Sequence, residues 1–479
     1  MRSDDGDLVK DVPRGRRRKS KGGSSRPAFV ALAGLLVLVA LTGGGSRADI
    51  LSLLILRPVS AVLFAYAVVF HGQAAWTRHP VAMRFAAAVL GLMLLQLVPL
   101  PPFLWTMLPG RTPLAEGMAA AGMALPWLPI AMAPADGWNA LFAMMAPVAA
   151  LILAIAAKRD EQILLLRMAA VGLVVSGLVG LFQIIGPDDG PLYYYALTNK
   201  GSAVGLFANR NHQAMALACI FPLLAMHVSL LRRSELSTRF NKRLALAAAV
   251  LIVPLMLVTG SRAGLVSLMV GLVGAAWVYC EPQVIGRVVK NRGLAPVQLF
   301  ILGSVVLGLL IVTILASRAE AVDRLLAADA TANIRAQALP TIGEAIWTYF
   351  PVGSGFGSFV PVYQQLEPGG LLNDTYLNHA HNEFAEMLMT GGLPALLILL
   401  GLAAAFVLTL RKAMTTYASV TGDVTDIVLQ RTGLVMIIIF VIGSMSDYPM
   451  RTPLIAVLTA LAIAAALAGW RQEAGQQGR

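Results

Sequence analysis

Long apolar runs alternate with short polar segments along most of this chain, and one long polar segment interrupts them at residues 317–380. About twelve runs are close to the roughly 20 residues that an α-helix needs to cross the hydrocarbon of a bilayer. A helix satisfies its own backbone hydrogen bonds in lipid, as irregular segments do not. The pattern therefore predicts an all-α polytopic membrane protein with about twelve transmembrane helices. The runs fall near residues 27–43, 51–70, 85–100, 138–157, 162–186, 211–231, 244–259, 263–280, 298–316, 382–410, 430–446 and 452–470.

Composition agrees with this class of protein. Hydrophobic residues make up 57% of the 479 residues, charged residues make up 13%, and the mean hydropathy is +0.73. These values lie well outside the range of soluble globular domains. Both cysteines, Cys219 and Cys280, fall within predicted spans, so we expect them to be small packing residues and not a disulfide.

The net charge of +12 mainly reflects the predicted topology. Lys and Arg gather at residues 14–21 and in the loops at 232–243 and 287–292, and such clusters mark the cytoplasmic side. The N-terminus is therefore predicted to lie inside. A basic N-terminal run could also bind nucleic acid, but anionic headgroups are the simpler partner. We expect contact with membrane lipids and no nucleic-acid partner.

The same topology puts four polar segments on the outer face, at residues 101–137, 187–210, 260–262 and 317–380. The first apolar run could instead be a signal peptide, because a basic region precedes it and Ser46-Arg47-Ala48 follows it. Its removal would leave eleven helices and would not change which side the other loops face.

Three arginines in the outer segments are candidates for binding an anionic group. Arg210 begins a predicted helix, where backbone N–H groups and a guanidinium suit a phosphate, although it could equally snorkel to the headgroups. Arg262 lies in the tight turn Thr259-Gly260-Ser261-Arg262-Ala263-Gly264 and needs an anionic partner, either a lipid diphosphate or a carboxylate such as Asp447. Arg335 lies beside the apolar stripe of a predicted helix and faces either a site or solvent, with solvent favoured.

The long loop holds two further features. Its helix, predicted over residues 331–349, has apolar residues four apart, so we expect it to lie against the membrane face, with Pro340 kinking or dividing it. The run Pro351-Val352-Gly353-Ser354-Gly355-Phe356-Gly357-Ser358-Phe359 has glycines at alternate positions. That spacing suits close backbone approach to a ligand, and it suits loop packing equally well.

The loop ends at Asn378-His379-Ala380-His381-Asn382-Glu383-Phe384. A neutral imidazole at a membrane boundary can accept the proton of an attacking hydroxyl, which makes His381 the candidate base. Helical periodicity would group His381 with Leu388 and would turn Glu383 and Glu386 towards other faces. Either histidine could also have a capping role. Two histidines two residues apart could bind a metal, but no convincing third ligand is present, so no metal and no cofactor are predicted.

Taken in order, these motifs resemble the O-antigen ligase and O-antigen polymerase superfamily of bacterial envelope proteins. The resemblance is strongest over residues 245–405, where the turn at 259–264 and the glycine-rich run at 351–359 precede Ala380-His381-Asn382-Glu383-Phe384 and Gly392-Leu393. Ala385 and Pro394-Ala395 depart from the family pattern, and these differences affect helix packing more than the proposed chemistry. Three upstream runs are also similar to the family: Gln96-Leu97-Val98-Pro99-Leu100-Pro101-Pro102, Leu108-Pro109-Gly110-Arg111 and Phe207-Ala208-Asn209-Arg210-Asn211-His212.

The resemblance implies an inverting, metal-independent glycosyltransferase of the membrane-embedded C class. It would move a glycan from undecaprenyl diphosphate to an acceptor hydroxyl at the periplasmic face of the bacterial inner membrane. His381 would be the base or would position the acceptor. Arg210 and Arg262 would bind the diphosphate with Arg335 as a third, because fixed guanidiniums stabilise a leaving group whose charge grows in the transition state. His379 and Asn382 are assigned to substrate binding.

The expected partners are an undecaprenyl-diphosphate-linked glycan and an acceptor glycan or lipid A core. An O-antigen ligase or a polymerase of O-antigen or exopolysaccharide is favoured over a protein O-oligosaccharyltransferase. A lipid-linked glycan flippase or transporter is the alternative from another class. It would need charged residues at mid-membrane depth along several spans, and only Arg167 stands out there. The sequence has no Walker loop or dinucleotide fingerprint, which disfavours an ATP-driven pump. A non-catalytic assembly partner would leave His381 dispensable.

The expected organisation has four parts. They are a basic cytoplasmic tail at 1–26, N-terminal transmembrane helices at 27–244, a ligase- or polymerase-like core at 245–405 that includes the periplasmic loop 317–380, and C-terminal helices with a cytoplasmic tail at 406–479.

Overall fold

The computed structural model describes residues 26–231, 235–279, 330–372, 376–415 and 424–470. Within these ranges the regular structure is helical, apart from one bridge between Leu100 and Leu128. The all-α prediction is confirmed. The predicted span at 298–316, the tail at 1–25 and Cys280 lie outside the described residues.

Nine helical segments of the described chain are long and apolar enough to cross a membrane. Two shorter apolar helices, α1 (Arg26–Thr42) and α3 (Pro80–Gln96), account for two further predicted runs. Eleven of the twelve predicted runs therefore have a helical counterpart. The nine segments are α2 (Leu53–Arg78), α6 with α7 (Pro134–Ala143 and Met145–Ala156), α8 (Arg159–Ile185), α9 with α10 (Arg210–Ala218 and Ile220–Ser229), α11 (Glu235–Val258), α12 (Arg262–Tyr279), α18 (Glu383–Thr415), α19 (Val424–Ser444) and α20 with η3 (Pro453–Ala466 and Leu467–Trp470).

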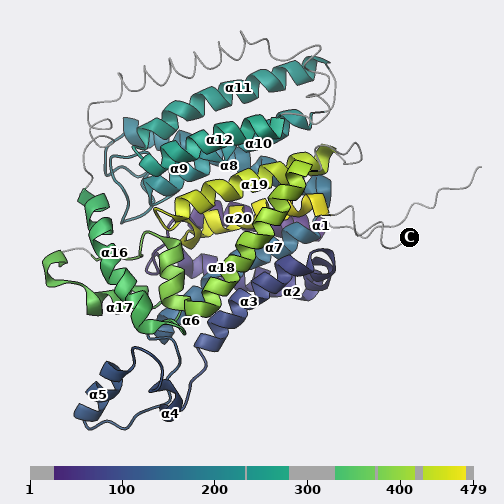
Figure 1. The fold of residues 1–479 in the computed structure, drawn as a ribbon. Coiled ribbons are helices and arrows are strands. Elements are labelled where there is room, and N and C mark those ends of the chain that lie inside the picture. Colours follow the sequence, from purple (N-terminus) through teal and green to yellow (C-terminus); the bar gives the residue numbers. More distant parts are fainter. Residues whose placement is uncertain (1–25, 232–234, 280–329, 373–375, 416–423, 471–479) are drawn as a thin grey trace, which may run out of the picture.

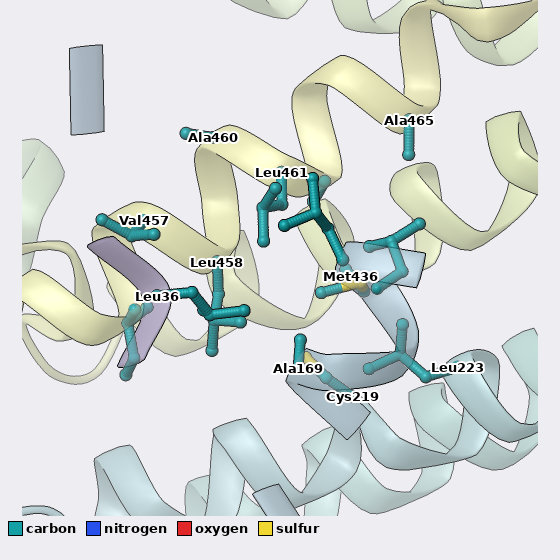
Figure 2. Close-up of a cluster of buried hydrophobic side chains, with 14 of the residues drawn as sticks. Leu36, Ala169, Cys219, Leu223, Met436, Val457, Leu458, Ala460, Leu461 and Ala465 are labelled. Atoms are coloured by element: carbon teal, nitrogen blue, oxygen red, sulfur yellow. The ribbon is translucent and has the colours of Figure 1, made fainter. Parts of the chain in front are cut away.

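The main apolar core contains buried residues from both ends of the chain. Figure 1 shows the corresponding helices, such as α7 and α20, lying side by side. Helices α1, α7 and α8 pack there with α9 to α12 and with α19 and α20. Small residues permit close approach, as is usual between helices in lipid. A Cβ on Gly433 of α19 would lie 2.2 Å from the Ala462 carbonyl oxygen of α20. Cys219 is a buried free thiol in this core, as predicted for a packing residue (Figure 2).

Helix α18 is kinked near its N-terminal end. Gly392 has φ 58° and ψ −148°, and Pro394 follows inside the same helix. A Cβ on Gly392 would lie 2.2 Å from the Pro351 carbonyl oxygen, so this position requires glycine for both its conformation and its space. The kink separates the first turns of α18 from the long apolar part of the span.

Helices α16 (Ala330–Tyr349) and α17 (Phe359–Leu366) lie at one end of the bundle and pack on the first turns of α18 (Figure 1). The predicted helix over residues 331–349 is confirmed, but Pro340 does not divide it. Its apolar stripe does not lie free against a membrane face, because Ala338, Ile342 and Tyr349 are buried against α17 and α18. The stripe is a protein-packing surface.

The glycine-rich turn after α16 packs against protein backbone. Gly353, Gly355 and Gly357 all have φ between 83° and 95°. A Cβ on each would lie 2.4 Å from the Thr390 carbonyl oxygen, 2.3 Å from Ala131 Cα and 2.4 Å from the Asp136 carbonyl oxygen, respectively. Of the two interpretations of this motif, the contacts favour loop packing over ligand approach.

A separate lobe, residues 100–128, follows α3 and contains the short helices α4 (Pro102–Trp105) and α5 (Thr112–Ala120). Its two ends are joined by reciprocal backbone hydrogen bonds between Leu100 and Leu128, of 2.9 and 3.1 Å. Figure 1 shows this lobe projecting beyond the helices of the bundle.

Candidate functional site

Asp447 is the centre of a polar cluster at the end of the bundle that carries α16 and α17. It lies in the short connection between α19 and α20 and is fully buried. Its Oδ1 accepts hydrogen bonds from His381 Nδ1 at 3.1 Å and from the Tyr448 backbone N–H at 3.0 Å. Its Oδ2 accepts from the side-chain amides of Asn209 and Asn211, at 3.2 and 2.6 Å. Four donors, from two distant segments and from the adjacent residue, thus converge on one carboxylate.

These donors keep Asp447 ionised. Burial alone would raise the pKa of its carboxyl group, but the hydrogen bond from His381 and the positive charge of Arg335 hold that pKa below its usual range. For His381, burial lowers the pKa of the imidazole, and the charge of Arg335 lowers it further, against the opposing effect of Asp447. His381 is therefore neutral near pH 7.

The protonation of His381 follows from its partner. An ionised carboxylate can only accept a hydrogen bond, so we assign the single ring proton of His381 to Nδ1, which faces Asp447. This leaves a lone pair on Nε2. An imidazole held in this tautomer by a buried carboxylate is arranged to accept a proton at its other nitrogen.

The backbone of His381 is unusual. Its φ of 50° is the one positive value among the described non-glycine residues, and it precedes α18, which begins at Glu383. The prediction that His381 shares a helical face with Leu388 is therefore wrong, because the helix has not yet begun at that position. Left-handed conformations of bulky residues persist where surrounding contacts impose them, and they concentrate at functional sites.

The ring of Tyr448 contacts three imidazole rings. The centroid of its ring lies 4.5 Å from that of His379, 4.8 Å from that of His381 and 5.2 Å from that of His212. Its hydroxyl accepts a hydrogen bond from Asn378 Nδ2 at 3.3 Å. The tyrosine thus holds the histidine loop from one side while Asp447 holds it from the other.

The two carboxylates at the start of α18 also face this cluster, contrary to the prediction from helical periodicity. Glu386 accepts from the Ala380 backbone N–H at 3.0 Å, lies 3.0 Å from His379 Nδ1 and pairs with Arg451 at 3.1 Å. Glu383 accepts from the Ser444 hydroxyl and from the Met450 backbone N–H. Both are buried, and both tie the histidine loop to the connection between α19 and α20.

Arg210 lies at the edge of this centre, and Arg262 follows the turn beside Arg210. Arg210 begins α9 between Asn209 and Asn211, the two residues that bind Asp447. A Cβ built on Gly260 would stand 3.9 Å from Arg210 Nη1, so the guanidinium of Arg210 lies beside the turn that leads into α12. Arg262 begins α12 two residues later.

Arg335 is half-buried on α16, and its charge acts on His381, Asp447 and Tyr448. Its partial burial and this electrostatic influence favour a position facing the cluster over the solvent-facing position preferred from sequence. The structure brings this arginine to the same end of the bundle as Arg210 and Arg262.

The remaining two predicted site residues have local partners. His379 is bound to Glu386 through Nδ1. Asn382 caps α18, because its side-chain oxygen accepts from the Ala385 backbone N–H at 3.1 Å. These contacts explain how the loop is held, and any substrate contact of His379 and Asn382 remains a prediction.

Sequence reasoning did not assign Asp447 to the base. It considered this residue only as a partner for Arg262, and it left Asn209, Asn211 and Tyr448 without a role. The available signal in the sequence was weak. Asp447 is a carboxylate in a five-residue gap between two apolar runs, and the predicted topology puts this gap on the outer face. A buried charge at such a boundary requires a partner, but the sequence does not say which one.

Comparison with known proteins gives one family match, over the middle of the chain. Residues 246–400 match a family model described as O-antigen ligase. The matched segment contains Arg262, Arg335 and His381, whereas Arg210 and Asp447 lie outside it. A search of the curated proteins found no match. The matched segment, about a third of the chain, is similar to the O-antigen ligase family, and this similarity supports a general role in joining or extending glycans for this polytopic membrane protein.

Proposed function

We propose that this protein is an inverting glycosyltransferase of the bacterial inner membrane that moves a glycan from undecaprenyl diphosphate to an acceptor hydroxyl at the periplasmic face. The observation that carries the proposal is the pair formed by His381 and the buried carboxylate of Asp447, at 3.1 Å. The pair lies among arginines at one end of a membrane-spanning bundle, which suits a reaction between a proton-bearing acceptor and an anionic lipid.

In the proposed reaction the acceptor oxygen attacks the anomeric carbon of the donor sugar. The bond between that carbon and the diphosphate oxygen breaks, the configuration inverts, and undecaprenyl diphosphate leaves with the bonding electron pair. His381 Nε2 takes the proton of the acceptor hydroxyl. Asp447 stabilises the imidazolium that forms, since its carboxylate already faces the protonated Nδ1.

The arginines serve the leaving group. Negative charge on the diphosphate grows as the glycosidic bond breaks, so guanidiniums fixed beforehand stabilise the transition state more than the ground state. Arg210 and Arg262 are proposed as the diphosphate ligands, because one lies beside the turn that carries the other. Arg335 is proposed as a third, and no metal is needed in this scheme.

The test is glycan transfer by purified protein in nanodiscs supplied with undecaprenyl-diphosphate glycan and acceptor, without nucleotide. Wild type is expected to release undecaprenyl diphosphate and to form product, while His381→Ala and Arg262→Ala lose transfer although they remain folded. His71→Ala on α2 and Arg84→Ala on α3 are matched controls that change the same residue types away from the cluster. Variants that match wild type would overturn the proposed site and leave transport or assembly as the leading function.

The product also distinguishes the activities within the family. Ligation to lipid A core, lengthening of a polysaccharide and glycosylation of a protein hydroxyl give different acceptor masses. We favour a ligase or polymerase acting on surface polysaccharide, because the matched family model describes ligation of O-antigen. Transfer to a protein acceptor would contradict that preference and leave the proposed chemistry unchanged.

A further inference from the structure

The lobe at residues 100–128 exposes large apolar side chains. Phe103 is 67% exposed, Met107 79% and Trp127 64%, and Leu104 and Met123 are also exposed. Five large apolar side chains exposed within so short a segment are uncommon on a part of a protein that faces water. The described residues do not cover it.

Charge is nearly absent from the lobe. Its sequence contains one basic and one acidic residue, Arg111 and Glu116. The Arg111 side chain is 2% exposed, donates to the Ile130 carbonyl oxygen and lies 5.6 Å from the centre of the Tyr349 ring. The exposed surface is therefore apolar with one carboxylate, which fits a hydrocarbon boundary and offers no positive charge to an anionic headgroup.

The lobe continues a surface that already faces lipid. At the end of α3 the side chains of Leu95 and Val98 are exposed, and Trp138 and Phe142 are exposed on α6, which packs on α3. These belong to apolar segments of the bundle, so hydrocarbon covers them once the protein is in a bilayer. Trp127 and Phe103 extend that apolar surface outwards, to the depth where aromatic side chains gather in membrane proteins.

The neck of the lobe is tied to the segment that carries the site. Ala131 donates its backbone N–H to the Gln96 carbonyl oxygen at 2.9 Å, and Met132 donates to the Ser354 carbonyl oxygen at 2.8 Å. The buried side chain of Gln96 donates to the Thr390 carbonyl oxygen on α18 at 3.0 Å and accepts from the Phe356 N–H at 3.0 Å. The lobe and the first turns of α18 are therefore one connected unit.

We propose that the 100–128 lobe is an interfacial anchor that inserts Phe103, Met107 and Trp127 among the acyl chains of the outer leaflet. The anchor sets the depth of the lobe, and through Gln96 and the glycine-rich turn it sets the height of the His381 loop above the hydrocarbon. Binding depends on apolar contact and not on lipid charge, because the basic residue of the lobe is buried. The inference stands apart from the proposed function, since it concerns how the protein sits in the bilayer.

Spin-label accessibility in phosphatidylcholine nanodiscs tests this. Single cysteines replace Phe103, Met107 or Trp127 in a background with Cys219→Ala and Cys280→Ala, and each label is exposed to oxygen and to a water-soluble nickel chelate. Leu95→Cys on α3 is the lipid-facing control, and Gln364→Cys, exposed on α17, is the water-facing control. The proposal expects the ratio of oxygen to nickel accessibility at the three lobe positions to match Leu95 and to exceed Gln364 several-fold.

Ratios equal to that of Gln364 would overturn the proposal, because the lobe would then stand in water. Low accessibility to both reagents together with spin–spin broadening would also overturn it, and would assign the surface to a second copy of the chain. A label-free measurement guards against disturbed folding. Brominated lipids should quench the fluorescence of wild type more than that of Trp127→Phe, and replacing part of the phosphatidylcholine by an anionic lipid should not change the difference.

Discussion

The glycine-rich turn at 351–359 and the histidine loop at 378–382 both pack on the first turns of α18, and both contain residues with positive φ. In the turn these residues are glycines pressed against backbone, with Gly355 against Ala131. In the loop the residue is His381, held by a buried carboxylate. Unusual backbone therefore serves close packing in one segment and places the proposed base against a buried carboxylate in the other.

The largest effect is expected from the pair that distinguishes the histidine loop. His381→Ala should lower the rate of glycan transfer by about 10²–10⁴-fold, the usual contribution of a positioned general base. Asp447→Asn should approach the same loss, because the amide no longer enforces the Nδ1–H tautomer. Transfer rates measured at saturating donor, compared with the rate of His71→Ala, check this. A near-normal rate for Asp447→Asn would show that the carboxylate does not contribute to the transfer step.

The glycine-rich turn should respond in stability and not in chemistry. Gly355→Ala places a Cβ 2.3 Å from Ala131 Cα at a φ of 95°, and we expect about 2–4 kcal/mol of destabilisation. Gly370→Ala in the same outer region meets no atom within 4 Å and should be nearly neutral. Thermal unfolding in detergent measures both. A stable Gly355→Ala protein that no longer binds donor would instead make the turn a ligand contact.

A smaller effect on glycan transfer is expected for Glu386, which holds the histidine loop without contacting His381. Glu386→Gln keeps the size of the side chain but weakens its contacts with His379 and Arg451. Removing a charge-assisted partner costs about 1–3 kcal/mol, so transfer should fall by about tenfold through misplacement of the loop. The acid limb of the pH–rate profile should stay where it is in wild type, and a displaced limb would show that Glu386 acts on His381 directly.

The smallest effect concerns the pH dependence. The base works in its neutral form, so transfer should be lost as the pH falls through the pKa of His381, which lies below the ordinary histidine value. Arg335→Gln removes a charge that lowers this pKa, and the acid limb should therefore move to higher pH. Pre-steady-state transfer rates across the acid range measure the limb. A limb that does not move would remove Arg335 from the neighbourhood of the base.

Most of the fold could be predicted because apolar run length alone determines where a helix can cross lipid. The helices α2, α8, α12 and α19 follow runs that hydropathy identifies directly. His381 could be singled out as a candidate because it stands in a short local motif at a predicted membrane boundary, and its role as the base stays a prediction. Sequence-based prediction works where the informative residues lie within one segment.

The rest of the site could not be predicted because its contacts join distant segments. Asp447 meets a histidine 66 positions earlier and an asparagine 238 positions earlier, and no local period reports such pairing. The placement of Glu383 and Glu386 was missed for a different reason. The prediction assumed that the helix had already begun at His381. The positive φ of His381 delays the start of α18 to Glu383, so the helical faces differ from those predicted.

The carboxylate of Asp447 also has a consequence for how the protein is made. Synthesis proceeds from the N-terminus, so Asn209 and Asn211 enter the membrane long before the residue that they bind has been translated. His381 likewise emerges before its carboxylate. The cluster therefore assembles only after the ribosome has passed Tyr448, and a half-made chain has no carboxylate to orient the imidazole of His381.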